Sequence, residues 1–129
     1  MQNSREKLWR VALKFTEELP ELEVAYKEHL TDYEDEPLPY IFFPDAVRDV
    51  LRQMRCGTLT DSFYKRLGTR IENELPSLRS DDPDTYDLIV LGLLTEIHNS
   101  DLWKPMRGHL GPKATDALRK YLSWKPGQA

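Results

Sequence analysis

The most apolar stretch of the chain is TYDLIVLGLLTEI, residues 85–97, and the chain around it is rich in charged residues. Its β-branched residues and its shortness would also fit a buried strand. The preceding residues favour a helix, because Asp82 can cap a helix start and Pro83 suits the first helical position. We expect a central helix over about residues 83–97, buried on most faces. Its inward-facing residues would be Tyr86, Leu88, Ile89, Val90, Leu91, Leu93, Leu94 and Ile97.

Prolines and glycines divide the rest of the chain into shorter helical segments. The aromatic stretch at residues 40–43 would fit a strand, but no second convincing strand is present to pair with it. We expect an extended or short helical segment that fills the core, with the next helix starting at Pro44 or Asp45. The further helices are expected over about residues 4–19, 21–30, 45–55, 60–75, 102–109 and 112–123.

The sequence therefore predicts an all-α fold. It would be a single compact domain over residues 1–129, made of six or seven short helices around the central apolar helix. A chain of this length can bury a core without disulfides or metal. Residues 124–129 should form a frayed tail.

The composition of the chain disfavours some classes of partner. The formal net charge of −4 and the pI near 5.4 give no overall electrostatic attraction to nucleic acid or to an anionic membrane. No stretch approaches the roughly 20 apolar residues of a membrane span, and the charged N-terminal segment lacks the apolar core of a signal peptide. The single cysteine, Cys56, cannot form an internal disulfide. We expect a cytoplasmic protein that makes no membrane contact.

Sequence patterns that would indicate catalysis or a cofactor are missing. The glycines are scattered singly and form no phosphate-binding loop, and no cysteine or histidine pair has zinc-ligand spacing. We expect partly exposed positions near helix ends for His29, His98 and His109. We therefore expect no catalytic, cofactor-binding or metal-binding residues. One alternative stays open, a small enzyme whose site would assemble from Glu96, His98 and His109.

A basic row offers another alternative, a helical nucleic-acid-binding regulatory module. The row consists of Arg48, Arg52 and Arg55 with Lys65, Arg66 and Arg70, on two expected helices joined by a short glycine-containing turn, as in a helix-turn-helix motif. Nucleic acid would be bound through Arg48, Arg52, Arg55 and Lys65. Acidic residues dilute the row, and DNA-binding domains usually carry a stronger basic excess. A solvated face with ion pairs between neighbouring turns is the favoured interpretation.

Two acidic runs differ in the role that we expect for them. At residues 81–84, helix capping explains at least Asp82 and Asp84. The loop at residues 32–36 has no such role, and an aromatic ring among carboxylates suits a basic partner, because it combines an anchor with electrostatic steering. Trp103 is a second candidate contact, although burial would also explain it. The expected partner-binding residues are Asp32, Tyr33, Glu34, Asp35, Glu36 and Trp103.

Four short segments follow one another in a characteristic order: LPEL at 19–22, YKEHL at 26–30, LPYIFFPD at 38–45 and LGP at 110–112. This order resembles a group of small bacterial helical proteins, some of which are similar to immunity proteins of polymorphic or contact-dependent toxin systems. The resemblance implies a bacterial cytoplasmic protein that neutralises a toxin domain by binding it. It assigns no role to any particular residue.

We therefore expect a binding protein, an immunity protein that blocks a cognate toxin through an acidic surface around the loop at residues 32–36. Many toxin domains act on nucleic acids and are basic. An acidic inhibitor would associate with such a domain quickly and could cover its phosphate-binding cleft.

Overall fold

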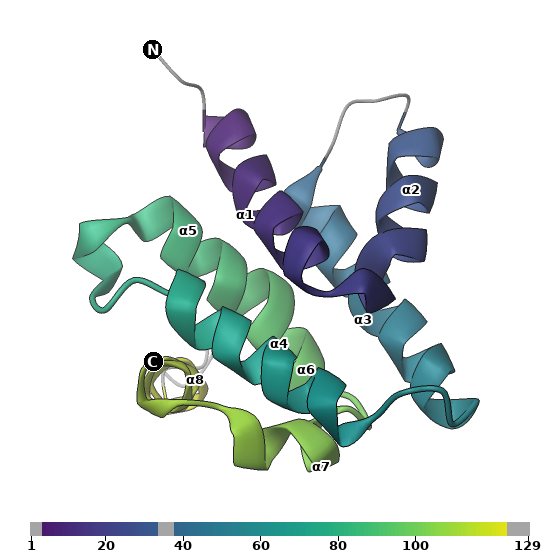
Figure 1. The fold of residues 1–129 in the computed structure, drawn as a ribbon. Coiled ribbons are helices and arrows are strands. Elements are labelled where there is room, and N and C mark those ends of the chain that lie inside the picture. Colours follow the sequence, from purple (N-terminus) through teal and green to yellow (C-terminus); the bar gives the residue numbers. More distant parts are fainter. Residues whose placement is uncertain (1–3, 34–37, 124–129) are drawn as a thin grey trace.

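The chain folds into a bundle of short helices, and the computed structural model describes residues 4–33 and 38–123 (Figure 1). Most of these residues are helical and none of them lies in a strand, which confirms the expected all-α class. None of the helices in these ranges is long and apolar enough to cross a membrane. The longer helices are α1 (Ser4–Glu18), α2 (Glu23–Asp32), α3 (Pro39–Arg55), α4 (Asp61–Glu74) and α8 (Pro112–Ser123). The shorter ones are η1 (Pro20–Leu22), η2 (Arg79–Asp81), α7 (Trp103–Met106) and η4 (Arg107–His109).

The apolar stretch that dominates the sequence forms one continuous helical run. It consists of α5 (Pro83–Asp87), η3 (Leu88–Leu94) and α6 (Thr95–His98). Helices α3 and α8 pack against η3, and α1 packs against α5, so the run is covered on several sides. As expected, Asp82 caps its start, because Oδ1 of Asp82 accepts a hydrogen bond from the backbone N–H of Thr85 at 3.2 Å.

The middle of this run, η3, is a π-helix, in which backbone N–H groups bond to carbonyls five residues earlier. The N–H of Thr95 bonds to the carbonyl of Val90, while Oγ1 of Thr95 donates to the carbonyl of Leu91 at 2.8 Å. The wider turn changes the directions in which side chains point, and Leu91 is 43% exposed. The prediction that Leu91 faces the core was therefore wrong. The other aliphatic residues expected inside are buried: Leu88, Ile89, Val90, Leu93, Leu94 and Ile97.

Helix α3 begins earlier than expected, at Pro39 rather than at Pro44 or Asp45. Pro44 therefore lies inside the helix, where it cannot donate the usual hydrogen bond to the carbonyl four residues earlier. Burial of Phe42 and Phe43, which are 0% and 1% exposed, offsets this cost, because burying a large apolar side chain contributes about 1.5–3 kcal/mol. The aromatic stretch fills the core from the first turns of a regular helix.

Helix α4 makes two close contacts with the C-terminal third of the chain. A Cβ atom at Gly68 would lie 2.2 Å from the carbonyl oxygen of His109, so glycine allows α4 to pack directly on η4. Further along α4, the Glu72 carboxylate accepts hydrogen bonds from the backbone N–H groups of Lys113, at 2.9 Å, and Ala114, at 3.0 Å. A helix start leaves such N–H groups without intrahelical partners, so Glu72 caps α8 from another helix.

Candidate protein-binding surface

The end of α2 carries the described part of the expected acidic loop. Asp32 is exposed at the last position of α2, and Tyr33, which follows it, is half-buried. The ring of Tyr33 lies against the ring of His29, with 4.6 Å between the ring centroids. The other expected contacts of this loop lie outside the described residues; they are Glu34, Asp35 and Glu36.

His29 connects the end of α2 to the start of α3. Its Nε2 atom accepts a hydrogen bond from the backbone N–H of Leu38 at 2.9 Å, so the neutral ring carries its proton on Nδ1. The side chain is 2% exposed, and the prediction of a partly exposed histidine was wrong here, because the indole of Trp9 on α1 stacks over the ring. Burial lowers the pKa of His29, although the negative charges of Asp45 and Asp32 oppose this shift.

Two exposed apolar side chains follow at the start of α3. Tyr40 is 46% exposed and Ile41 is 38% exposed. The ring of Tyr40 lies beside η3, since a Cβ atom at Gly92 would be 3.8 Å from its Cδ1 atom. Burial raises the pKa of Tyr40, and the charges of Asp87 and Asp84 raise it further. Tyr40 thus offers an aromatic contact next to carboxylates.

We call these two segments the α2–α3 corner, defined by Asp32, Tyr33, Tyr40 and Ile41. The sequence predicted its α2 part but missed its α3 part, because the stretch at residues 40–43 was assigned to the core as a whole. If the helix had been expected to start at Pro39, its 3.6-residue period would have placed Phe42 and Phe43 in the core and Tyr40 and Ile41 at the surface, as the structure does.

The structure does not bring Trp103 to this corner. Trp103 lies on α7, far from the end of α2 (Figure 1). Its side chain is half-buried, and its ring contacts the ring of His98, with 4.8 Å between centroids. It also lines a small hollow with Leu118 and Leu122 of α8. Packing explains this position, and a partner contact through Trp103 would need a second surface.

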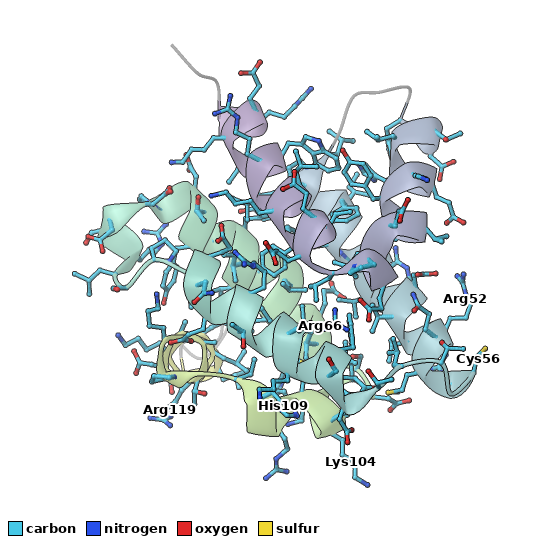
Figure 2. The ribbon with its side chains drawn as sticks, viewed as in Figure 1. Arg52, Cys56, Arg66, Lys104, His109 and Arg119 are labelled. Atoms are coloured by element: carbon cyan, nitrogen blue, oxygen red, sulfur yellow. The ribbon has the colours of Figure 1, made fainter. Side chains whose placement is uncertain are left out.

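The arginines of the expected basic row are held in ion pairs. The pairs on α3 are Arg48–Asp45, Arg52–Asp49 and Arg55–Asp101. On α4, Arg66 donates two hydrogen bonds to the carboxylate of Glu21, at 3.1 and 2.7 Å. Figure 2 places Arg66 on the body of α4 and Arg52 at the edge of the molecule. The pairs Arg48–Asp45 and Arg52–Asp49 confirm the expected ion pairs between neighbouring turns of α3. Arg55 and Arg66 pair instead with residues distant in the sequence, and Lys65 is exposed on α4.

The residues of the alternative enzyme site lie on two elements. Glu96 and His98 belong to α6, and His109 belongs to η4. Nδ1 of His98 lies 3.2 Å from the side-chain oxygen of Asn99. Within residues 4–33 and 38–123, no three His, Cys, Asp or Glu side chains are placed to hold a metal ion. Cys56 is exposed just beyond α3 (Figure 2).

The second acidic run has the structural role that the sequence predicted. Besides capping α5, Asp82 accepts a hydrogen bond from Nζ of Lys7 at 2.6 Å. Burial would raise the pKa of Asp82, but the hydrogen bonds from Lys7 and Thr85 outweigh it and hold the pKa below its ordinary value. Asp84 lies in the first turn of α5, at the positive end of the helix dipole.

Comparisons of the chain with protein-family models, curated proteins and solved structures gave no match. Function therefore has to be inferred from the chemistry of the chain's own surface.

Proposed function

We propose that the chain is a binding protein that neutralises a bacterial toxin domain by direct contact, which is the role of an immunity protein. The surface assigned to this contact is the α2–α3 corner. The observation that carries the proposal is the exposure of two apolar side chains, Tyr40 and Ile41, at the start of α3, together with the exposed carboxylate of Asp32 at the end of α2. Protein interfaces commonly combine apolar or aromatic anchors with a charged rim.

The charges near the corner favour a basic partner. Asp32 is exposed, and Asp84 and Asp87 lie close enough to raise the pKa of Tyr40. Opposite charges on two proteins increase their association rate and help to select the correct partner. A toxin domain that binds phosphate through basic residues has the complementary charge, and a chain bound over those residues would block it.

Co-expression with a cognate toxin domain, which the proposal expects to be encoded in a neighbouring gene, tests the proposal. The wild-type chain should restore growth and co-elute with the toxin on a sizing column. The double variant Asp32→Lys, Tyr40→Ala should raise the dissociation constant by at least about tenfold, which corresponds to about 1.4 kcal/mol. It reverses a rim charge and removes an anchor. Trp103→Ala, measured in the same assay, shows whether the α7 side contributes a second contact.

A matched charge reversal serves as the control. Glu17 is exposed near the end of α1 and outside the corner, so Glu17→Lys should leave the affinity unchanged. Circular dichroism of each variant shows whether it is folded. Killing that continues in the presence of the wild-type chain, with no complex on the column, would overturn the proposed function. An equal loss of affinity in Glu17→Lys and in the double variant would show that net charge, rather than the corner, determines binding.

A further inference from the structure

A hollow of about 350 Å³ lies between α7 and α8. We call it the α7–α8 hollow. Its lining is mostly apolar and includes Trp103 on α7 with Leu118 and Leu122 on α8, while Arg119 contributes a charge. The volume is at the lower end of the range for small-molecule pockets, about 300–1,000 Å³. The hollow therefore suits one large apolar side chain better than a whole helix.

Three cations lie around this hollow. Arg119 lines it, and Lys104 directly follows Trp103 on α7. The backbone N–H of Arg107 bonds to the carbonyl of Trp103, which places Arg107 one helical turn further on the same side. All three cations are exposed and form no ion pair with the described residues. Figure 2 shows Lys104 and Arg119 pointing outward on the side of the molecule formed by α7 and α8.

The carboxylates near this face do not cancel its charge. Residues 103–123 contain five lysines and arginines but only one acidic residue, Asp116. Asp116 pairs with Lys120 at 3.0 Å, and Asp101 before α7 lies 3.6 Å from Arg55 of α3. Glu96 on α6 is half-buried and does not line the hollow. The face therefore carries a local excess of positive charge, although the chain as a whole is acidic.

We propose that this face binds an acidic segment of another protein, in which one large apolar side chain is flanked by carboxylates. The apolar side chain would fill the α7–α8 hollow against the ring of Trp103. The flanking carboxylates would pair with Arg119 and Arg107, since a guanidinium can hold a carboxylate through two hydrogen bonds. Tryptophan and arginine are the residue types that most often dominate the binding energy of protein interfaces.

A nucleic-acid strand fits this face less well than an acidic protein segment does. Proteins that bind single strands stack successive bases on several aromatic side chains along a basic groove. Here a single aromatic ring, Trp103, lines the hollow, and it is half-buried with His98 against it. A long polyanion would also meet the acidic remainder of the chain, whereas a short acidic segment needs only the local charges.

The proposed surface differs from the α2–α3 corner in place and in the partner that it selects. Helix α7 lies far from the end of α2 (Figure 1). The corner presents carboxylates to a basic partner, whereas this face presents cations to an acidic one. It is the second surface that a partner contact through Trp103 requires.

Binding of a synthetic peptide tests this inference. The probe is a short fluorescein-labelled peptide with one phenylalanine between glutamates, and fluorescence anisotropy measures its dissociation constant. The wild-type chain should bind it saturably. Arg119→Glu should raise the dissociation constant by at least about tenfold, because it places a like charge beside the glutamates. Replacing the phenylalanine of the peptide by alanine should weaken binding to a similar degree, because the hollow then stays unfilled.

A matched charge reversal at the other end of the molecule serves as the control. Arg5 is exposed in the first turn of α1, so Arg5→Glu changes the net charge equally and should leave the affinity unchanged. Circular dichroism shows whether both variants are folded. The absence of saturable binding at millimolar peptide would overturn the inference, as would an equal loss of affinity in the two variants.

Two further measurements distinguish other occupants of the face. A labelled oligothymidylate that binds more tightly than the peptide, and is released by Arg119→Glu, would assign the face to nucleic acid instead. A dimer on a sizing column that Arg119→Glu dissociates would assign it to a second copy of the chain. Either result would contradict the proposed acidic segment. The assay contains no toxin, so its result is independent of the proposed function.

Discussion

At the scale of single residues, His29 is a buried histidine with a defined role. Its unprotonated Nε2 accepts the Leu38 N–H, and Nδ1 finds no hydrogen-bond partner among the residues that the structure describes. Protonation would convert Nε2 from an acceptor into a donor facing another donor. The contact between the end of α2 and the start of α3 therefore depends on a neutral ring.

Acidification should destabilise the wild type more than the variant His29→Gln. Burial keeps the pKa of His29 in the folded chain below the ordinary 6.5, so the unfolded chain binds more protons as the pH falls through this value. The free energy of unfolding therefore decreases from there down to the folded pKa. Glutamine can accept the same hydrogen bond without titrating. Thermal unfolding followed between about pH 7.5 and pH 5 measures the difference.

The control for this prediction is His98→Gln, because His98 is half-exposed on α6. That variant should keep the pH dependence of the wild type. A His29→Gln variant that loses stability on acidification as steeply as the wild type does would contradict the assigned role of His29.

Gly68 illustrates how one residue permits two elements to approach each other. Gly68→Ala should destabilise the fold by about 1–3 kcal/mol, the usual range for overpacking, because its Cβ would lie 2.2 Å from a backbone carbonyl. Helix propensity acts in the opposite direction and would favour alanine. Urea unfolding measures the effect. Gly108→Ala is the control, since a Cβ there meets nothing within 4 Å, and a similar loss in both variants would argue against a steric cause.

At the scale of elements, the start of α8 depends on a carboxylate from α4. Glu72→Ala should destabilise the fold by about 0.5–2 kcal/mol, as the loss of a helix cap does, and Glu72→Gln should cost less, since it keeps one acceptor oxygen. The same contact explains why residue 111 is a glycine, because a Cβ atom there would lie 2.5 Å from Cδ of Glu72. Chemical denaturation measures both variants. Glu17→Ala, on the exposed face of α1, should be neutral, and a neutral Glu72→Ala would show that solvent caps α8 equally well.

At the scale of the whole molecule, folding brings together charges that the chain keeps apart. Residues 71–100 are acidic in balance and residues 101–129 are basic. Parts of both segments line one surface groove between η3 and α8. The charged side chains along this groove include two ion pairs, Arg79 with Asp87 and Lys120 with Asp116.

The sequence by itself determined the fold class and most helix boundaries. Proline and glycine act locally on the backbone, and an Asp-Pro pair favours a helix start. The start of α5, the end of α4 and the limits of α8 could therefore be read without the structure. The helical spacing of the apolar residues identified the central helix, because this spacing is also a local feature of the sequence. In the candidate site, the sequence predicted Asp32 and Tyr33 as contacts, because an acidic loop with an aromatic residue is visible in the sequence itself.

Tertiary packing decided the rest. It extended α3 back to Pro39, because the burial of Phe42 and Phe43 outweighs the hydrogen bond that Pro44 cannot make. It buried His29, widened η3 and turned Leu91 outward, and it supplied a cap for α8 from a residue about 40 positions earlier. These outcomes depend on which elements meet in space, and local propensities contain no information about that.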